Sequence, residues 1–412
     1  MTYDEAITWI YSTQSVGIKL GLDNITRLLC ELKIETTPFA KHGPTIFHVA
    51  GTNGKGSVCA LLDSICRFAG LRTGLFTSPH LVTFRERIRL NGTMISEEDA
   101  AAGLTEIRAI VSRWERHPTF FEIATALALR WFKQNGAQAI VLETGLGGRL
   151  DATNAITPSV AVITSLSLDH RQYLGNSLEE IAAEKAGIFK PGVPVVSTPQ
   201  PPQAACVLEE KARQTGVPLT WITEPVKSEV ALPGSHQKLN AALALAALSA
   251  ARLLIPQTAV EQGLKKVVWP GRFQLIERPD GKTLVLDGAH NEAAAARLVQ
   301  TWHERYGQTR PVILLGVLRD KDVAAICREL APMAAEMIAT PVHSVRSCTA
   351  AELAEAIREV APGLLCREAG SAAEALELAE SRKAPVLVTG SLFLMGEILA
   401  LLDGGKAEIS AQ

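Results

Sequence analysis

The stretch Thr45-Ile46-Phe47-His48-Val49-Ala50-Gly51-Thr52-Asn53-Gly54-Lys55-Gly56-Ser57 decides the fold of the first part of this chain. Its apolar start predicts a buried strand, and Val58 to Phe68 predict the helix that follows. A glycine-rich turn between a strand and a helix lets backbone N–H groups converge on an anion, which the helix dipole also attracts. Lys55 adds a positive charge, so the stretch is typical of a nucleotide-binding loop. Gly56 separates Lys55 from Ser57, which departs from the usual Gly-Lys-Ser/Thr ending, and a glycine-rich helix start without a ligand is the alternative.

Length and composition indicate a globular chain with more than one core. At 412 residues the chain exceeds the usual size of a single core, so we expect two domains. A net charge of −2 gives no electrostatic footprint for nucleic acid. The N-terminus lacks the features of a signal peptide, and the apolar run 241–251 is too short to span a membrane, so we expect no membrane contact. The 7 cysteines include no CxxC pair, which favours a reduced, cytoplasmic protein without disulfides or structural zinc.

Candidate strands alternate with candidate helices in the first part of the chain, which predicts a parallel sheet covered on both faces. The predicted strands are 45–49, 72–77, 139–143, 160–165 and 194–197. The predicted helices are 3–12, 24–32, 57–69, 97–113, 121–135, 178–186, 203–215, 239–254 and 258–266.

A second alternating series follows. Its predicted strands are 283–286, 312–316, 336–340, 364–367 and 386–389, and its predicted helices are 292–306, 323–330, 350–360, 372–381 and 393–402. The breaker Trp269-Pro270-Gly271 and the turn signal Arg278-Pro279-Asp280-Gly281 lie between the two series. We therefore expect an α/β protein with a P-loop ATPase-like parallel-sheet domain over residues 1–272 and a smaller Rossmann-like domain over residues 273–412.

Polar side chains follow several predicted strands at the edge where open parallel sheets bind ligands. Glu143 ends an apolar strand, Ser78 and His170 follow two others, and Ser57 lies on the phosphate-binding loop. Because the carboxyl ends of parallel strands share one edge, these side chains could converge, and a carboxylate with hydroxyl groups suits Mg²⁺. Each also has a structural alternative: an ordinary strand-end glutamate, a turn-capping serine, or a hydrogen-bonded scaffold histidine.

Three charged residues further along the chain have a functional and a structural interpretation. Arg272 could clamp a phosphate through its guanidinium group. Asp287 ends an apolar strand and could accept hydrogen bonds from ribose hydroxyls, or it could cap the helix after Asn291. Lys185 lies near the end of an amphipathic helix, where the alternative is a solvated lysine that balances the helix dipole.

The chain resembles the folylpolyglutamate synthases and dihydrofolate synthases of the Mur ligase superfamily. The resemblance rests on the loop at 51–57 and on an ordered set of motifs that spans nearly the whole chain. These motifs are Thr77-Ser78-Pro79-His80-Leu81, Thr119-Phe120-Phe121-Glu122, Glu143-Thr144-Gly145-Leu146-Gly147-Gly148-Arg149-Leu150-Asp151-Ala152-Thr153-Asn154, Leu168-Asp169-His170, Glu184-Lys185-Ala186-Gly187-Ile188, Pro270-Gly271-Arg272-Phe273 and Asp287-Gly288-Ala289-His290-Asn291. It implies a Mur ligase-like fold in which the second domain is the glutamate ligase domain.

The resemblance also implies roles for particular residues. ATP would be bound by Thr52, Asn53, Gly54, Lys55, Gly56, Ser57, Asn240, Arg272 and Asp287. Two magnesium ions would have their ligands among Ser57, Ser78, Glu143 and His170. Lys185 would be carbamylated, which turns its amine into an anion, and would act in catalysis with Lys55 and His170.

The pterin of the substrate would be bound by Thr119, Phe120, Phe121, Glu122, Leu150, Asp151 and Ala152, again by resemblance. The sequence leaves alternatives for two of these features. The Phe120-Phe121 pair could belong to the core, which is the commoner fate of adjacent phenylalanines. Asp151 could cap a turn beside Thr153.

The activity implied is that of an ATP-dependent ligase acting as a monomer on dihydropteroate, folates and L-glutamate. It would join L-glutamate to dihydropteroate, and to the glutamate tail of tetrahydrofolate, through an acyl phosphate. A ligase restricted to polyglutamylation and another Mur-type amino-acid ligase are the nearest alternatives. A P-loop kinase or ATPase, and a non-catalytic nucleotide-binding module, are the alternatives from other classes.

Overall fold

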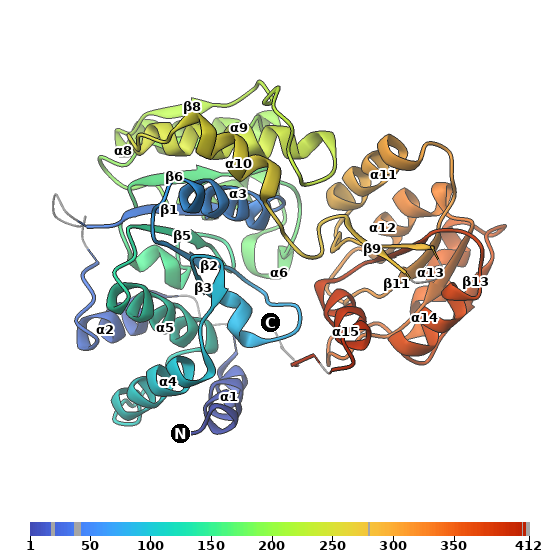
Figure 1. The fold of residues 1–412 in the computed structure, drawn as a ribbon, viewed down its shortest axis with the longest axis horizontal. Helices are drawn as coiled ribbons and strands as arrows, with labels where there is room; N and C mark the ends of the chain where they lie inside the picture. The colour runs from blue at the N-terminus through green and yellow to red at the C-terminus, as the bar shows by residue number, and fades with distance from the viewer. Residues whose placement is uncertain (18–20, 37–42, 279–280, 406, 409–412) are drawn as a thin grey trace.

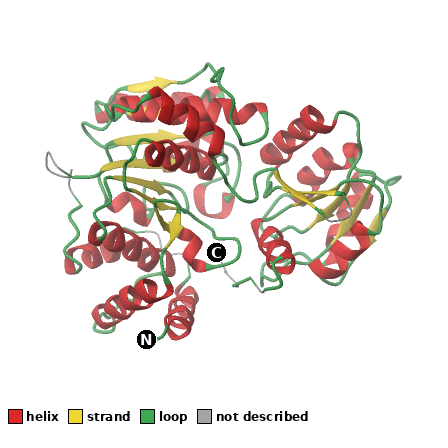
Figure 2. Cartoon of the chain, in the orientation of Figure 1, coloured by secondary structure: helices red, strands yellow, loops and turns green. Residues whose placement is uncertain are grey.

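The computed structural model describes residues 1–17, 21–36, 43–278, 281–405 and 407–408. Within them the chain forms two α/β units that lie side by side, one around an eight-stranded sheet and the other around a six-stranded sheet (Figure 1). Helices pack around the strands of both units (Figure 2). The predicted α/β fold class is therefore confirmed.

The first sheet has the strand order β4-β3-β2-β5-β1-β6-β7-β8. Its strands are β1 Thr45–Ala50, β2 Thr73–Phe76, β3 Ile88–Leu90, β4 Thr93–Met94, β5 Ala139–Glu143, β6 Val160–Ile163, β7 Val195–Ser197 and β8 Leu219–Trp221. The strands from β2 to β8 in this order pair in parallel, so their carboxyl ends meet at one edge. The central strands β1, β5 and β6 are almost entirely buried, as expected for a sheet covered on both faces.

The first sheet is mostly parallel, as predicted, and becomes antiparallel only on its β3 side within the described residues. β3 pairs antiparallel with both β2 and β4, and neither β3 nor β4 was predicted. β3 and β4 are joined by a tight hairpin whose central residues, Asn91 and Gly92, have φ of 52° and 80°. An Asn-Gly pair favours this left-handed geometry, so the hairpin had a sequence signal.

The helices of the first unit pack around its sheet (Figure 2). They are α1 Tyr3–Ser12, α2 Asp23–Glu31, α3 Lys55–Phe68, α4 Glu97–Val111, α5 Phe120–Gln134, α6 Arg171–Leu174, α7 Leu178–Ala186, α8 Pro202–Thr215, α9 Ser235–Ala250 and α10 Gln257–Lys266, with 3₁₀ turns at Thr13–Val16, Phe84–Arg87 and Ala152–Ala155. α9 begins before the predicted start at Leu239, directly after Gly234, whose φ is 102°. The short helix α6 and the strand β8 were not predicted.

The second sheet has the order β13-β12-β11-β14-β10-β9. Its elements are β9 Gln274–Glu277, β10 Thr283–Leu286, α11 Glu292–Tyr306, β11 Val312–Leu315, α12 Val323–Leu330, a 3₁₀ turn at Ala331–Met333, β12 Glu336–Ala339, α13 Ala350–Val360, β13 Cys366–Glu368, α14 Ala372–Glu380, β14 Val386–Thr389 and α15 Leu392–Leu402. β9, which was not predicted, pairs antiparallel with β10 at the edge of this otherwise parallel sheet. Pro279 and Asp280 of the predicted turn lie outside the described residues.

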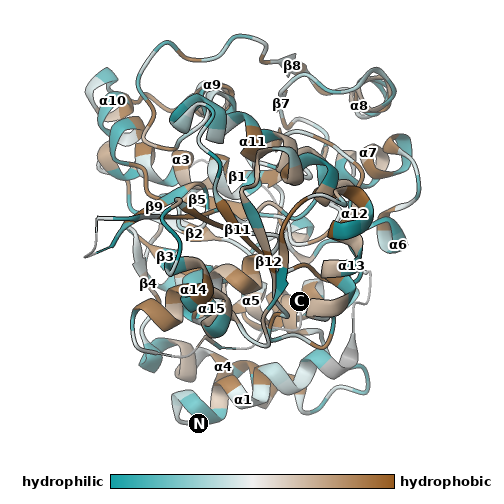
Figure 3. Cartoon of the chain, turned by 90° about the vertical axis from the view of Figure 1, so that its right-hand side faces the viewer, coloured by the Kyte–Doolittle hydropathy of each residue, from teal (hydrophilic) through white to brown (hydrophobic). Residues whose placement is uncertain are grey.

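Apolar residues concentrate on the strands inside the molecule, and the surface helices present polar faces (Figure 3). The two units also touch closely. A Cβ on Gly396 of α15 would lie 2.0 Å from the carbonyl oxygen of Leu81, so only glycine allows this approach. Among the described residues, no helix is long and apolar enough to cross a membrane.

Candidate active site

A cavity of about 610 Å³ is lined by residues from both units. Every residue that the sequence analysis proposed for ATP, magnesium or the pterin lines this cavity, from Thr52 in the first unit to Asp287 in the second. The predicted convergence of Ser57, Ser78 and Glu143 at the strand ends is therefore seen in the structure. Their roles depend on the local geometry described below.

The loop after β1 has the backbone that an anion site needs. Gly51 has a φ of 154°, and a Cβ there would lie 1.8 Å from the hydroxyl oxygen of Thr164. Gly54 has a φ of 91° and precedes the first residue of α3, Lys55. The Lys55 ammonium donates to the carbonyl oxygens of Gly51 at 3.2 Å and Thr52 at 3.4 Å. The loop therefore places a cation and a helix N-terminus at the cavity.

Lys185 is buried, so the interpretation of this residue as a solvated lysine is wrong. Its side chain is 4% exposed, and its amine donates to the carbonyl oxygen of Gly51 at 2.9 Å. Burial, together with the positive charge of Lys55, lowers the pKa of Lys185 to about 7. A substantial fraction of this amine is therefore neutral near neutral pH.

Glu143 has the environment of a cation ligand. Its carboxylate is buried at the end of β5 and accepts a hydrogen bond from the backbone N–H of Ser78 at 3.1 Å. Burial raises its pKa, and the charges of Lys55 and Arg272 oppose the rise without forming a close ion pair among the described residues. Ser57 and Ser78 also line the cavity.

These groups fit a hard divalent cation that is held jointly with a nucleotide. The described residues contain no cluster of three or more His, Cys, Asp or Glu side chains with metal-binding geometry. Mg²⁺ is commonly bound by one or two carboxylates while substrate phosphates and water supply the other ligands. Glu143, with the hydroxyls of Ser57 and Ser78, matches this pattern.

His170 lies at the start of α6 with a φ of 50°, in the left-handed region. Burial and the charge of Lys321 lower its pKa to about 3, so the imidazole is neutral and able to act as a ligand. The Lys321 ammonium lies 3.5 Å from its Nε2. His170 is thus connected to the second unit through Lys321.

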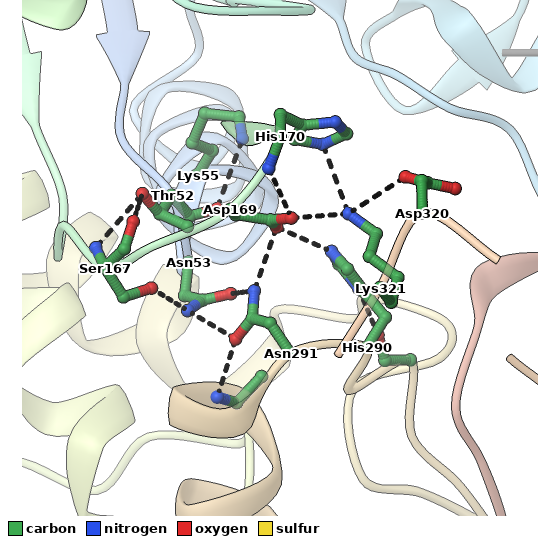
Figure 4. A network of polar contacts seen from close by, with 12 residues as sticks. Thr52, Asn53, Lys55, Ser167, Asp169, His170, His290, Asn291, Asp320 and Lys321 are labelled. Atoms are coloured by element: carbon green, nitrogen blue, oxygen red, sulfur yellow. Dashed lines mark hydrogen bonds and ion pairs between the residues drawn. The ribbon is translucent and has the colours of Figure 1, made fainter. Parts of the chain in front are cut away.

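Asp169 joins the two units (Figure 4). Its carboxylate accepts hydrogen bonds from the Lys321 ammonium at 2.5 Å and from the side-chain amide of Asn291 at 3.0 Å. Burial raises the pKa of Asp169, but the hydrogen bond from His290 and the charges of His290 and Lys321 together hold it well below its usual value. The side-chain amides of Asn53 and Asn291 also exchange two hydrogen bonds of 3.1 Å.

The sequence analysis gave no role to this inter-unit network. Asp169 belongs to the motif Leu168-Asp169-His170 and Asn291 to the motif Asp287-Gly288-Ala289-His290-Asn291, whereas Lys321 belongs to none of the family motifs. Lys321 lies in Leu318-Arg319-Asp320-Lys321-Asp322, shortly after the strand β11. The rule that drew attention to Glu143, a charged residue after a buried parallel strand, would have found it.

The residues proposed for the nucleotide are held in place by hydrogen bonds within the protein. Asn240 of α9 lies against the loop, with its Oδ1 3.2 Å from where a Cβ of Gly54 would be. The Asp287 carboxylate accepts from the backbone N–H groups of Phe273 at 2.8 Å and Ala289 at 2.9 Å. Asp287 does not cap α11, because Asn291 is the residue that accepts from the N–H of Ala294. Arg272 also lines the cavity. Burial raises the pKa of Asp287, and the positive charge of Arg272 opposes this rise.

The residues proposed for the pterin line the part of the cavity formed by the start of α5 and the segment after β5, which we call the proposed pterin end. Thr119 and Glu122 make a capping box that starts α5, with the Glu122 carboxylate accepting from the Thr119 N–H at 2.7 Å. Phe120 is 1% exposed and stacks on Tyr11 with ring centroids 5.5 Å apart, so its ring belongs mainly to the core, as the structural alternative allowed. Phe121 is only half-buried and lies under Gly145, where a Cβ would be 2.6 Å from the ring.

Asp151 caps the 3₁₀ turn at Ala152–Ala155, which was the structural alternative for this residue. Its Oδ1 accepts from the N–H and the hydroxyl of Thr153, and its Oδ2 accepts from the N–H groups of Gly145 and Leu146, each at 2.9 Å. Asp151 therefore organises the loop at Gly145 and Leu146, which lines the cavity.

The fold and this site define a Mur-type ligase. The chain matches the Mur ligase middle domain over residues 49–198 and the Mur ligase glutamate ligase domain over residues 271–392. It is 33% identical to the dihydrofolate synthase/folylpolyglutamate synthase of Bacillus subtilis, across 96% of this chain and 98% of the relative. The chain belongs to the dihydrofolate synthase/folylpolyglutamate synthase family, which confirms the resemblance.

Solved structures agree with this assignment. A structure of E. coli FolC in complex with DHPP and ADP superposes with a TM-score of 0.87 at 31% identity, covering 97% of this chain and 98% of that one. The bifunctional folylpolyglutamate synthase/dihydrofolate synthase of Yersinia pestis, complexed with AMPPNP and a Mn ion, gives a TM-score of 0.85 at 33% identity over 98% of each chain.

Proposed function

We propose that this chain is an ATP-dependent ligase that joins L-glutamate to dihydropteroate and to the glutamate tail of tetrahydrofolate. A substrate carboxylate oxygen attacks the γ-phosphorus of ATP, and the bond to the β,γ-bridging oxygen breaks, giving an acyl phosphate and ADP. The amine of L-glutamate then attacks the acyl carbon, an amide forms, the amine loses a proton and phosphate leaves. The observation that carries the proposal is one cavity that unites the phosphate-binding loop with the capping box at the start of α5.

Charge stabilisation at the transferred phosphoryl group is the task of the loop. Lys55 lies at the N-terminus of α3, so its ammonium and the backbone N–H groups at the start of the helix, 54–57, would face the same anion, whereas those of Thr52 and Asn53 donate to the carbonyl oxygen of Ser165. Arg272, which also lines the cavity, supplies a second cation. A magnesium ion held near Glu143, Ser57, Ser78 and His170 would neutralise phosphate oxygens when bound.

Lys185 is proposed to carry a carbamate. A neutral amine attacks CO₂, a nitrogen–carbon bond forms and one proton is lost, so a cation becomes an anion. The burial of Lys185 and its low pKa favour the neutral amine that this step needs. The resulting anion would stand next to the loop, where a second cation needs a ligand.

The proposed division of the chain falls between residues 272 and 273. Its support is that β8 is the last strand of the first sheet along the described chain, and β9 begins the second sheet at Gln274. All residues proposed for the reaction come from one chain, so a single copy supplies the whole site and a monomer suffices.

Product analysis tests the function. The purified protein is incubated with ATP, magnesium and labelled L-glutamate, with dihydropteroate or tetrahydrofolate in parallel reactions, and the products are identified by mass. We expect ADP, phosphate and an amide from both acceptors. An amide from tetrahydrofolate alone would restrict the function to polyglutamylation, and a stable phosphorylated acceptor would indicate a kinase.

A further inference from the structure

His48 is the one residue of β1 whose side chain does not suit a buried central strand. The strand reads Thr-Ile-Phe-His-Val-Ala, and His48 is 0% exposed between Leu142 of β5 and Ala161 of β6. Burial, with a contribution from the charge of Lys190, lowers its pKa to about 3. The imidazole is therefore neutral under ordinary conditions and carries one ring proton.

A chain of hydrogen bonds leads from this imidazole to the cavity. His48 Nε2 lies 2.7 Å from the hydroxyl oxygen of Thr153. The Thr153 hydroxyl donates to Asp151 Oδ1, and Asp151 Oδ2 accepts from the N–H groups of Gly145 and Leu146. The hydroxyl has a single proton, and it goes to the carboxylate. His48 must then donate through Nε2–H, which fixes its tautomer and leaves Nδ1 as a bare acceptor.

This arrangement has a cost that a structural role alone does not explain. Nδ1 of His48 is buried and has no hydrogen-bond partner among the described residues. A buried acceptor without a partner is destabilising, and an apolar residue of similar size would avoid this cost. We therefore look for the function of His48 at its other ring nitrogen, where Nε2–H donates to the hydroxyl of Thr153.

The chain of hydrogen bonds from Nε2–H leads to the proposed pterin end of the cavity. Asp151 fixes the backbone at Gly145 and Leu146, and both residues line the cavity. Phe121 lies directly under Gly145, so a shift of this loop would change the surface offered to a flat ring. Four donors already fill the acceptor positions of Asp151, and its orientation depends on Thr153 for two of them.

We propose that His48 is a positioning residue for the acceptor substrate: through Thr153 and Asp151 it holds the Gly145–Leu146 loop in the shape that binds the pterin. This inference rests on the proposed function, which assigns the pterin to this end. Among the described residues, the side-chain hydrogen bond of His48 goes to Thr153 and not to a residue proposed for ATP or magnesium. Its effect is confined to the dihydropteroate or folate half of the reaction.

Three variants separate this role from simple packing. His48→Leu removes the donor and also removes the unpartnered Nδ1. His48→Gln keeps an N–H donor at about the position of Nε2. Thr153→Val breaks the chain at its middle. Phe47→Leu is the matched control, because Phe47 is fully buried on the same strand and, as the next residue, points to the opposite face of the sheet, where it packs with Val49.

The measurements are KM for dihydropteroate, KM for ATP, kcat and the thermal midpoint of each variant. We expect His48→Leu and Thr153→Val to raise the KM for dihydropteroate roughly three- to tenfold, the range that loss of one hydrogen bond produces, with an unchanged KM for ATP. His48→Gln should restore most of the affinity. The thermal midpoint of His48→Leu should not be lower than that of Phe47→Leu. The Phe47→Leu control should keep the KM values of the unmodified protein.

The opposite results would overturn the proposal. If the three variants lower kcat in step with their folded fraction and leave the KM for dihydropteroate unchanged, His48 is only a packing residue. Failure of the proposed function looks different, because the unmodified protein would then form no amide from dihydropteroate. Selective ¹⁵N labelling of histidine, assigned with His48→Leu, gives an independent check: Nδ1 should show the shift of an unprotonated ring nitrogen, and a protonated Nδ1 would contradict the tautomer on which the chain depends.

Discussion

The ammonium group of Lys185 and that of Lys55 both donate to the carbonyl oxygen of Gly51, at 2.9 Å and 3.2 Å. One of these lysines lies on α7 and the other at the start of α3, so the first glycine of the phosphate-binding loop links two helices. Two positive charges this close are unfavourable unless an anion arrives or one amine loses its charge. Either event reduces the repulsion between the positive charges of Lys55 and Lys185 at the loop.

Lys185→Ala should abolish most ligase activity, because it removes the group that we propose to carry the carbamate. Added short-chain carboxylic acids should restore part of the activity by filling the anionic position. Lys185→Arg should stay inactive, since it keeps a positive charge where the carbamate would be negative. Steady-state assays with and without acetate check this, and an active arginine variant would exclude the carbamate.

The stability of the protein should depend on pH through Lys185. In CO₂-free buffer its pKa is about 7 in the folded state and near its usual 10.5 in the unfolded state. The unfolded chain therefore binds more protons between these values, so the free energy of unfolding rises as pH increases from about 7 to 10. Lys185→Met should lack this rise. Urea denaturation at several pH values measures the difference between the two proteins, and parallel curves would show that the pKa is not depressed.

Lys55→Ala should reduce turnover strongly while leaving the fold intact. Lys55 is half-buried, and within the described part of the chain its hydrogen bonds go to the loop carbonyls of Gly51 and Thr52, so its main task is phosphate neutralisation. Losing such a contact typically costs about 2.7–4 kcal/mol, roughly 10²–10³ in rate. The check is kcat at saturating ATP together with circular dichroism. More than half of the original activity would contradict the assignment of the loop.

Glu143→Ala and His170→Ala should both increase the magnesium concentration needed for half-maximal activity, because a hard cation loses a ligand or its neighbour. High magnesium should rescue each variant at least in part. Glu143→Asp is the control that keeps the charge with a shorter reach. If the magnesium titration is the same for the variants and the unmodified protein, both residues have a structural role and do not bind magnesium.

Gly56→Ala should fail to stabilise the protein, although alanine favours a helix by about 1 kcal/mol over glycine. Gly56 lies in the first turn of α3, and a Cβ there would be 2.7 Å from the indole nitrogen of Trp269. With Trp269→Ala in the background, the same Gly56→Ala change should become stabilising. Urea denaturation of the two single variants and the double variant tests this coupling, and additive effects would show that the contact is not limiting.

The contact with Trp269 also explains why the loop has a glycine where other phosphate-binding loops do not. Trp269 lies just before the second sheet, between α10 and β9. The Gly56 departure in the sequence is therefore tied to a segment more than two hundred residues away. No local pattern around the loop contains that information.

Much of the fold could be predicted because the determining signals are local. The apolar runs of β1, β5 and β6 and the alternating helices specify two layered α/β units, since buried parallel strands need continuous apolar residues. Local signals also put Glu143, Ser78 and Lys55 at strand ends or on the loop, and the parallel sheet then brings them to one edge. The Asn91-Gly92 hairpin was equally local and was overlooked.

The sequence by itself determined the two α/β units, the phosphate-binding loop and the family of the chain, because contiguous residues encode periodicity, turns and motifs. Only the tertiary structure decided that Lys185 is buried against Gly51, that Asp169 pairs with Lys321 of the other unit, and that His48 reaches Asp151 through Thr153. Burial and pairing between residues 134 or 152 positions apart depend on how the elements pack. They set the pKa of each group, and so its chemistry, only once the chain has folded.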